Sequence, residues 1–314
     1  MSSSDFSERI AQLLVESGGY RDLDQPVIFA GGDLGLYYVN AEALLFDGGE
    51  WKNHKGSSVE LMNYALGRMG ESEEFAEVIG ILATAIDPKF ARRKIPLHTR
   101  AISGGETRDW IFSGPVAHEL GYPHISVYKK GSLYKASLHG GGFAQDGDGI
   151  SGMHAIHVAD LLTVGSSVYD TNQKPPTGWV PYVRNAGGQV SDVYAVVDRV
   201  QGGPENLRKA AGVDVACFVP IDADFLRKHS RNAALGIEYL KDPRKWSENY
   251  IREHGTDALM AFFDPKGKID HGRKFVRRYE NVLKESGRWE QLEAQARERY
   301  GVDINSLNPQ GAAK

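Results

Sequence analysis

The stretch "HAIHVADLLTVGSSVYD", residues 154–170, joins an apolar strand to a small polar turn, and Asp160 lies near the end of the strand. The turn consists of Thr163, Val164, Gly165, Ser166 and Ser167. In an open α/β sheet, ligands bind beyond the carboxyl ends of the strands. We expect this turn to start a helix, where free backbone N–H groups and the helix dipole favour a phosphate. The stretch therefore predicts a phosphate site beside a carboxylate, although a serine-rich helix cap after a strand has the same pattern.

The composition is that of an ordinary globular protein. Of 314 residues, 41% are hydrophobic and 25% are charged, which is enough apolar sequence for a large core. The formal net charge of -4 gives no sign of a nucleic-acid or membrane partner.

The cysteine content and the N-terminal sequence give no sign of a disulfide-bonded, secreted or membrane-spanning protein. The single cysteine, Cys217, excludes an internal disulfide and a cysteine metal cluster, and its apolar surroundings predict a small core residue. The first 20 residues lack a cationic region followed by an apolar run, so no secretory signal is expected. No stretch approaches the roughly 18 apolar residues of a membrane span. We expect a soluble cytoplasmic protein.

Strand and helix patterns alternate through the middle of the chain. Helical periodicity covers residues 5–18 and 57–86, the latter broken near Gly70, and a further helix is expected at 109–121. The expected strands are residues 99–103, 124–130, 153–162, 189–200 and 215–221. This order predicts an α/β fold with a mostly parallel twisted sheet flanked by helices.

Two segments depart from the alternation. Residues 130–152 are glycine-rich and long, which predicts a mobile functional loop. Residues 231–314 read as a helical C-terminal extension, so the predicted domains are 1–230 and 231–314. Acids interleave with the bases of the extension, which favours a solvated helical face over an RNA-binding patch.

Five segments, in order, resemble the type I phosphoribosyltransferases, and orotate phosphoribosyltransferase above all. The family's phosphoribosyl-diphosphate signature is an apolar strand, two acids, two apolar residues and Thr-x-Gly-x-Ser/Thr, and residues 154–167 resemble it. The other segments are "YYVN" (37–40), "SGGETRDWIFSGPVA" (103–117), "VYKKGSLYKASLHGG" (127–141) and "VVDRVQGGPENL" (196–207).

The resemblance implies a role for each segment. Thr163 to Ser167 would bind the ribose 5′-phosphate, and Asp160 would contact the ribose hydroxyls or transfer a proton. The residues that would bind or neutralise the diphosphate are Gly104, Gly105, Arg108, Lys129, Lys130, Lys135 and His139, the last three as catalytic residues of a closing loop. The residues that would meet the base are Tyr37, Tyr38 and Arg199. Mg²⁺ is implied, held mainly by substrate oxygens and water, and so is a homodimer.

Four features depart from the family pattern. Ala159 stands where the family has a first acid, and Ala30 and Asp33 stand where orotate enzymes have a lysine. The "ETR" stretch, residues 106–108, replaces the lysine of the diphosphate loop, and Pro175 with Pro176 cannot continue a helix after the phosphate turn.

Three functions remain open from the sequence. The first is phosphoribosyl transfer to orotate, in pyrimidine biosynthesis. The second is transfer to another nucleobase, and the third is a ligand sensor that has kept the fold without turnover. The retained Asp160 and the loop lysines favour an enzyme, whereas Ala159 favours a sensor.

Overall fold

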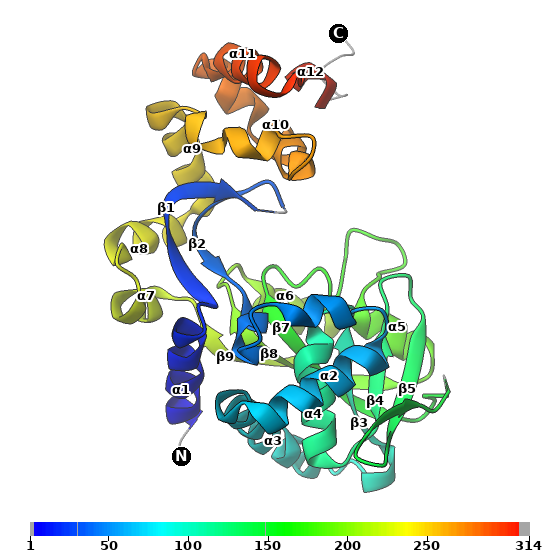
Figure 1. Cartoon of the computed structure of the whole chain (residues 1–314). Coiled ribbons are helices and arrows are strands. Elements are labelled where there is room, and N and C mark those ends of the chain that lie inside the picture. The colour runs from blue at the N-terminus through cyan, green and yellow to red at the C-terminus, as the bar shows by residue number, and fades with distance from the viewer. Residues whose placement is uncertain (1–2, 30, 148, 308–314) are drawn as a thin grey trace. The chain divides into compact units, whose positions relative to one another are not determined.

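The computed structural model describes residues 3–29, 31–147 and 149–307 of the chain (Figure 1). Its contacts fall into two compact units. Unit 1 comprises Met1–Tyr20 and Asn40–Asp222, and unit 2 comprises Arg21–Val39 and Ala223–Lys314. The predicted division of the chain into domains 1–230 and 231–314 stays a prediction. The contact units group residues 21–39 with the C-terminal helices.

Unit 1 is an α/β unit. Its helices are α1 (Ser3–Glu16), α2 (Ser58–Glu71), α3 (Glu73–Arg92), α4 (Asp109–Leu120), α5 (Trp179–Asn185) and α6 (Gly203–Ala211), with short 3-10 helices η1 (Ala41–Leu45), η2 (Glu50–His54) and η3 (Leu97–Thr99). Its strands are β3 (Arg100–Gly105), β4 (His124–Val127), β5 (Leu133–His139), β6 (Gly142–Gln145), β7 (His154–Leu162), β8 (Gln189–Asp198) and β9 (Asp214–Pro220).

The seven strands form one sheet in the order β6-β5-β4-β3-β7-β8-β9. Strands β4, β3, β7, β8 and β9 pair in parallel, whereas β5 and β6 pair antiparallel at one edge. The parallel strands thus follow the doubly wound order 2-1-3-4-5, in which the strand order reverses between β3 and β7. Ligands bind at such a switch point, outside the carboxyl ends of the strands.

Helices cover both faces of this sheet. A Cβ on Gly104 would lie 2.1 Å from Ser113 Oγ of α4, and one on Gly105 would lie 2.2 Å from Trp179 Cε2 of α5. Because neighbouring strand residues point to opposite faces, α4 and α5 lie on opposite sides of β3. The two glycines allow both helices to approach the strand.

Most of the predicted elements are confirmed. The five predicted strands correspond to β3, β4, β7, β8 and β9, and the fold class is the predicted one. The long helical segment divides at Ser72 rather than at Gly70, because the Ser72 hydroxyl caps α3 by accepting from the Phe75 N–H at 3.2 Å. Cys217 lies in β9 and packs against the core, as expected.

The prediction of a mobile loop over residues 130–152 is wrong for much of its length. Residues 133–139 and 142–145 form β5 and β6, which pair with each other around Gly140 and Gly141. Strand β5 also pairs with β4, where Ala136 opposite His124 is buried. The glycine content reflects the tight turn of a hairpin, since both turn glycines have positive φ values of 58° and 89°.

The prediction of a helix directly after the phosphate turn is also wrong. A single turn forms there, in which the N–H groups of Val168 and Tyr169 donate to the Gly165 carbonyl. The chain then extends, Asp170 pairs with Thr177 as an isolated bridge, and α5 begins only at Trp179. The two prolines between the turn and α5 cannot continue a helix.

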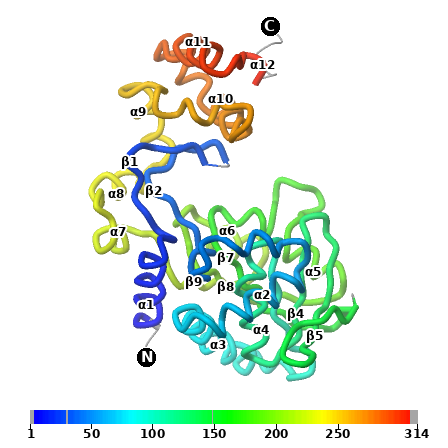
Figure 2. Tube along the Cα trace, viewed as in Figure 1, coloured from blue at the N-terminus to red at the C-terminus, as the bar shows by residue number. Residues whose placement is uncertain are grey.

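Unit 2 consists of a two-stranded sheet and helices (Figure 2). The strands are β1 (Tyr20–Ile28) and β2 (Leu34–Val39). The helices are α7 (Ala223–His229), α8 (Ala233–Lys241), α9 (Pro243–His254), η4 (Asp257–Phe263), α10 (Ile269–Glu285), α11 (Arg288–Tyr300) and α12 (Ile304–Leu307). The predicted helical character of the C-terminal segment is confirmed.

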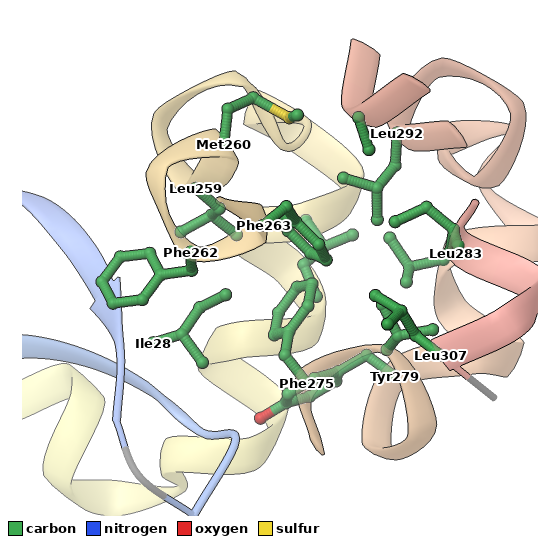
Figure 3. Close-up of a cluster of buried hydrophobic side chains, with 14 of the residues drawn as sticks. Ile28, Leu259, Met260, Phe262, Phe263, Phe275, Tyr279, Leu283, Leu292 and Leu307 are labelled. Atoms are coloured by element: carbon green, nitrogen blue, oxygen red, sulfur yellow. The ribbon is translucent and has the colours of Figure 1, made fainter. Parts of the chain in front are cut away.

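Unit 2 has a hydrophobic core of its own (Figure 3). Phe263, Phe275 and Leu283 are fully buried in it, and Ile28 from β1 packs into the same cluster. The strand pair therefore belongs to this core by contact, although it is separated from the helices by almost 200 residues of sequence.

Candidate functional site

The turn of residues 163–167 follows β7 at the switch point of the sheet (Figure 1). Within the described residues, none of the five backbone N–H groups of this turn donates a hydrogen bond. Gly165 has a φ of +85° and lies against Leu207 of α6, and Val164 is 48% exposed. A run of unpartnered backbone N–H groups at the end of a parallel strand is suited to bind an anion.

Asp160 lies just before this turn, and its side chain is 10% exposed. Its Oδ2 atom lies 3.2 Å from Nε of Arg108, which also approaches Oε1 of Glu42 at 3.5 Å. Arg108 is 48% exposed, whereas the Glu42 side chain is 8% exposed. The structure thus joins two of the predicted site residues, Asp160 and Arg108, to each other and adds a buried acid that the sequence did not suggest.

The protonation of Asp160 is strongly affected by its surroundings. Burial and the neighbouring carboxylate of Asp109 raise the pKa of Asp160 well above its ordinary value, and Arg108 opposes this only in part. The carboxylates of Asp160 and Glu42 raise the pKa of Arg108, so the guanidinium stays charged. The site therefore places a carboxyl that resists ionisation beside a fixed positive charge.

Asp109, the first residue of α4, points inward. Its Oδ2 accepts from the Gly105 N–H at 3.0 Å, and its Oδ1 accepts from the Asp160 N–H at 2.9 Å. His157 Nε2 lies 3.5 Å from Oδ2, and His157 Nδ1 lies 3.1 Å from Ser103 Oγ. Burial opposes ionisation, but the contacts with His157 and with the Asp160 N–H hold the pKa of Asp109 below its ordinary value.

A pocket of about 590 Å³ opens beside the β3–α4 loop. Its lining residues are Glu106, Tyr128, Lys129, Lys130, Ser132, Tyr134 and Gln145. Glu106 connects two predicted segments, because its Oε2 accepts from the Lys129 N–H at 2.9 Å. Tyr128 forms an aromatic wall between Trp110 and Tyr134, with ring centroids 4.8 and 5.4 Å away. The pocket brings two predicted lysines together with an acid and two aromatic rings.

Lys135 and His139 are placed differently from Lys130. Both lie on β5 and not on a loop, and neither is among the residues that line the pocket. Lys135 Nζ lies 3.1 Å from Asp146 Oδ2. The expectation of a loop carrying all three catalytic residues is therefore wrong, because β5 is hydrogen-bonded into the sheet. The catalytic roles of Lys135 and His139 stay predictions.

The segment after β8 lies next to the phosphate turn. The Arg199 N–H donates to the Leu162 carbonyl at 2.9 Å, and the side chain of Arg199 is partly buried. Asp198 Oδ1 accepts from the Val200 N–H at 2.9 Å, and burial raises the pKa of Asp198. The segment thus contributes to the same edge of the sheet as Asp160, as the sequence order suggested.

Gly104 and Gly105, two of the predicted diphosphate-binding residues, form hydrogen bonds within the protein. The Gly105 N–H group donates to Asp109, and the Gly104 carbonyl accepts from Trp110 Nε1 at 2.9 Å. Ala159 is buried in the core, so the face that carries the family's first acid is here apolar.

Tyr37 and Tyr38 belong to unit 2. Tyr37 is 3% exposed and packs edge to face against Tyr239, and Arg21 lies over the ring of Tyr38. Their contact with a base stays a prediction. Asp33 pairs with Arg278, and Ala30 lies outside the described residues.

Residues 3–29, 31–147 and 149–307 contain no group of three or more His, Cys, Asp or Glu side chains that could hold a metal ion. None of the helices in these ranges is both long and apolar enough to cross a membrane.

No protein-family model matches the sequence. The chain is 33% identical over 103 residues to orotate phosphoribosyltransferase of Pyrobaculum calidifontis, a match that covers 32% of this chain and 48% of that protein. This chain thus spans about half the length of the orotate phosphoribosyltransferases that it matches. The chain is also 30% identical over 152 residues to adenine phosphoribosyltransferase of Pasteurella multocida, which covers 46% of this chain and 79% of that protein.

Solved structures similar to this chain include an orotate phosphoribosyltransferase and a UMP synthase. Orotate phosphoribosyltransferase from Aeropyrum pernix has a TM-score of 0.42 at 18% identity and covers 70% of this chain and 98% of that chain. The UMP synthase of Leishmania donovani has a TM-score of 0.46 at 17% identity and covers 77% of this chain and 42% of that chain. From the sequence match to more than two thirds of the Pasteurella enzyme, this chain belongs to the type I phosphoribosyltransferase family, as a divergent member.

Proposed function

We propose that the protein transfers a phosphoribosyl group from 5-phosphoribosyl 1-diphosphate to a nitrogen base, and that orotate is the acceptor. The observation that carries this proposal is the turn of residues 163–167, whose five N–H groups have no acceptor within the described chain. A phosphate at the end of β7 would accept hydrogen bonds from this turn, and Ser166 and Ser167 add hydroxyl donors.

The ribose would then lie over Asp160, next to the phosphate turn. The carboxyl oxygens of Asp160 can accept hydrogen bonds from the two ribose hydroxyls. Arg108 is the last residue of the β3–α4 loop, and its positively charged guanidinium lies 3.2 Å from Asp160. A diphosphate in the adjacent pocket would compete with Asp160 for this guanidinium, because a multiply charged anion attracts it more strongly than a single carboxyl.

The reaction breaks the bond between ribose C1 and a diphosphate oxygen and forms a bond from C1 to a base nitrogen. Positive charge develops on the ribose while negative charge leaves with the diphosphate. Lys129 and Lys130 line the pocket and would stabilise the departing negative charge. The hydrophobic and aromatic wall of Trp110, Tyr128 and Tyr134 would limit the access of water.

Mg²⁺ is part of this proposal. The described residues include no group of three or more acids, histidines or cysteines that could hold a metal ion, which fits an ion held mainly by diphosphate oxygens and water. Glu106, at the pocket wall, is the carboxylate that would meet the hydrated ion. When bound, the ion would neutralise part of the leaving group's charge.

Adenine is the second candidate acceptor, because the curated relatives include adenine phosphoribosyltransferases matched over 67–80% of their length. Arg199 supports orotate, since a guanidinium fork matches a planar carboxylate, which adenine lacks. A homodimer, as the family resemblance implies, is proposed as the assembled form, and sedimentation analysis would test it.

The test is diphosphate release from phosphoribosyl diphosphate and Mg²⁺, with orotate, adenine and a panel of other bases in turn. We expect release that depends on orotate and the appearance of orotidine 5′-phosphate. Release with adenine or another base alone would reject orotate and keep the transferase. Tight binding of phosphoribosyl diphosphate without release for any base would reject the enzyme in favour of a sensor.

A further inference from the structure

Strands β3 and β7 separate before either of them ends. Their ladder runs from Arg100 opposite His154 to Ser103 opposite His157 and stops there. Beyond this point β3 continues to pair with β4 through Gly105, and β7 continues to pair with β8 through Leu162. The end of the ladder therefore leaves backbone groups of both strands without a partner across the switch point.

The side chain of Asp109 occupies this position. Its two oxygens accept from Gly105 N–H on β3 and from Asp160 N–H on β7, at 3.0 and 2.9 Å. One carboxylate thus replaces the missing ladder between the two strands. Asp109 is 7% exposed, and a buried charged acceptor forms stronger hydrogen bonds than a neutral one.

His157 supports the carboxylate from behind. Its Nε2 lies 3.5 Å from Asp109 Oδ2, and its other ring nitrogen contacts the fully buried Ser103 hydroxyl. His157 is itself 1% exposed, so its ring cannot turn away into solvent. The orientation of Asp109 is thereby fixed from three directions, by two backbone N–H groups and one ring.

We infer that Asp109 is a positioning residue that holds the β3–α4 loop at a fixed distance from Asp160 and the phosphate turn. The loop carries Glu106 and Arg108, and Asp160 lies in β7 just before the turn. Fixing these two segments fixes the distance between the groups that meet the diphosphate and the groups that meet the ribose phosphate. This role in catalysis rests on the proposed function, whereas the link between the strands does not.

The test uses Asp109→Asn, which keeps the size of the side chain but replaces one acceptor with an NH₂ group. Asp192→Asn is the matched control, because Asp192 is a 1% exposed acid in the same unit that pairs with Arg93 at 2.6 Å. Hydrogen exchange is measured by NMR at individual amides of both variants and of the wild type. In Asp109→Asn, the amides of Gly105 and Asp160 should exchange about tenfold to a hundredfold faster, the loss expected for a hydrogen bond to a charged group.

The control should leave these two amides unchanged even though it lowers the melting temperature. Unchanged exchange at both amides in Asp109→Asn, or an equal increase in Asp192→Asn, overturns the inference. If Asp109→Asn does not fold, hydrogen exchange of the wild type is the test. The amides of Gly105 and Asp160 should then be protected although the β3–β7 ladder has ended before them, and unprotected exchange at either amide overturns the inference.

The same proteins separate the inference from the proposed function. With phosphoribosyl diphosphate, Mg²⁺ and orotate, Asp109→Asn should lower turnover on the order of a hundredfold, the loss that a displacement of about 1 Å can cause. Its turnover should fall more than its affinity for ribose 5-phosphate, which contacts one segment only. Absence of turnover in the wild type rejects the proposed function. The link that Asp109 makes between β3 and β7 is then tested by hydrogen exchange alone.

Discussion

Removal of the Arg108 guanidinium would leave the buried acids Asp160 and Glu42 without their neighbouring positive charge. Two unit charges 4 Å apart attract each other by about 4 kcal/mol at an effective dielectric constant near 20. Arg108 is 48% exposed, however, so water screens part of this attraction. Exposed pairs contribute about 0.2–1 kcal/mol, and breaking a buried pair costs about 3–5 kcal/mol. For a half-exposed arginine between buried acids we expect Arg108→Ala to destabilise unit 1 by about 1–3 kcal/mol.

The cost should depend on pH. Without Arg108, the pKa of Asp160, already raised by burial and by Asp109, rises further. A carboxyl with a raised pKa in the folded state loses stability as the pH increases from its unfolded to its folded pKa, because the unfolded chain releases its proton first. The destabilisation by Arg108→Ala should therefore be larger at pH 8 than at pH 5.

Urea denaturation at both pH values, with Arg108→Ala, Asp160→Asn and the double variant, measures this coupling. Asp160→Asn removes the buried charge, so Arg108→Ala should cost about 1–2 kcal/mol less in that background at pH 8. Arg208→Ala is the control, since Arg208 is 49% exposed and its partner Glu205 is 74% exposed. Burial affects the pKa of Asp198 more than Arg208 does, so the pH dependence of this control should be smaller. Single-variant effects that add within about 0.5 kcal/mol at both pH values would refute the reasoning.

Three further predictions concern the pocket, the packing of β3 and a buried ring. Lys130→Ala should lower turnover far more than it weakens binding of ribose 5-phosphate, measured by calorimetry, and equal losses would make Lys130 a docking charge only. Gly105→Ala should destabilise the protein by about 1–3 kcal/mol, because the new Cβ lies 2.2 Å from Trp179 Cε2, whereas Gly67→Ala in α2 meets no atom within 4 Å and should be neutral or stabilising by melting temperature. Burial lowers the pKa of His124 to about 3, so its ring should stay neutral in NMR titrations down to about that pH. The free energy of unfolding should fall as the pH decreases from about 6.5 toward 3, because the histidine of the unfolded chain takes up its proton first. A His124 ring that titrates near pH 6.5 would contradict this.

Elements with a strong local pattern could be predicted from the sequence. The apolar runs of β7, β8 and β9 are buried on both faces, so their composition alone marks them as strands of a parallel sheet. The glycine after α4, Gly121, has a φ of +69° and ends the helix where the sequence placed its end. In these segments the local preference and the tertiary structure agree.

Other features depend on contacts between distant residues. Strand β5, "LYKASLH", is polar and half exposed because it lies near the sheet edge, so its pattern looks like that of a loop. Residues 21–39 have little apolar sequence before Val27 and form strands in contact with helices almost 200 residues away.

The candidate site divides in the same way. Asp160 and the phosphate turn are adjacent in sequence, so one motif predicts both. Glu42, Asp109 and His157 reach the site from three separate elements, and no local pattern marks them. An acid in the first turn of a helix, as at Asp109, is ordinarily explained by the helix dipole alone, which conceals its contact with Asp160.

We propose that the carboxyl ends of the central strands β3 and β7 bind a sugar diphosphate. Hydrogen exchange of the wild type, with and without phosphoribosyl diphosphate and Mg²⁺, tests it most directly. We expect new protection at residues 163–167, whose N–H groups lack acceptors within the described chain, together with residues 107–109 and 130. Binding that leaves the amides of residues 163–167 as exposed as before, or that protects only residues of unit 2, would contradict it.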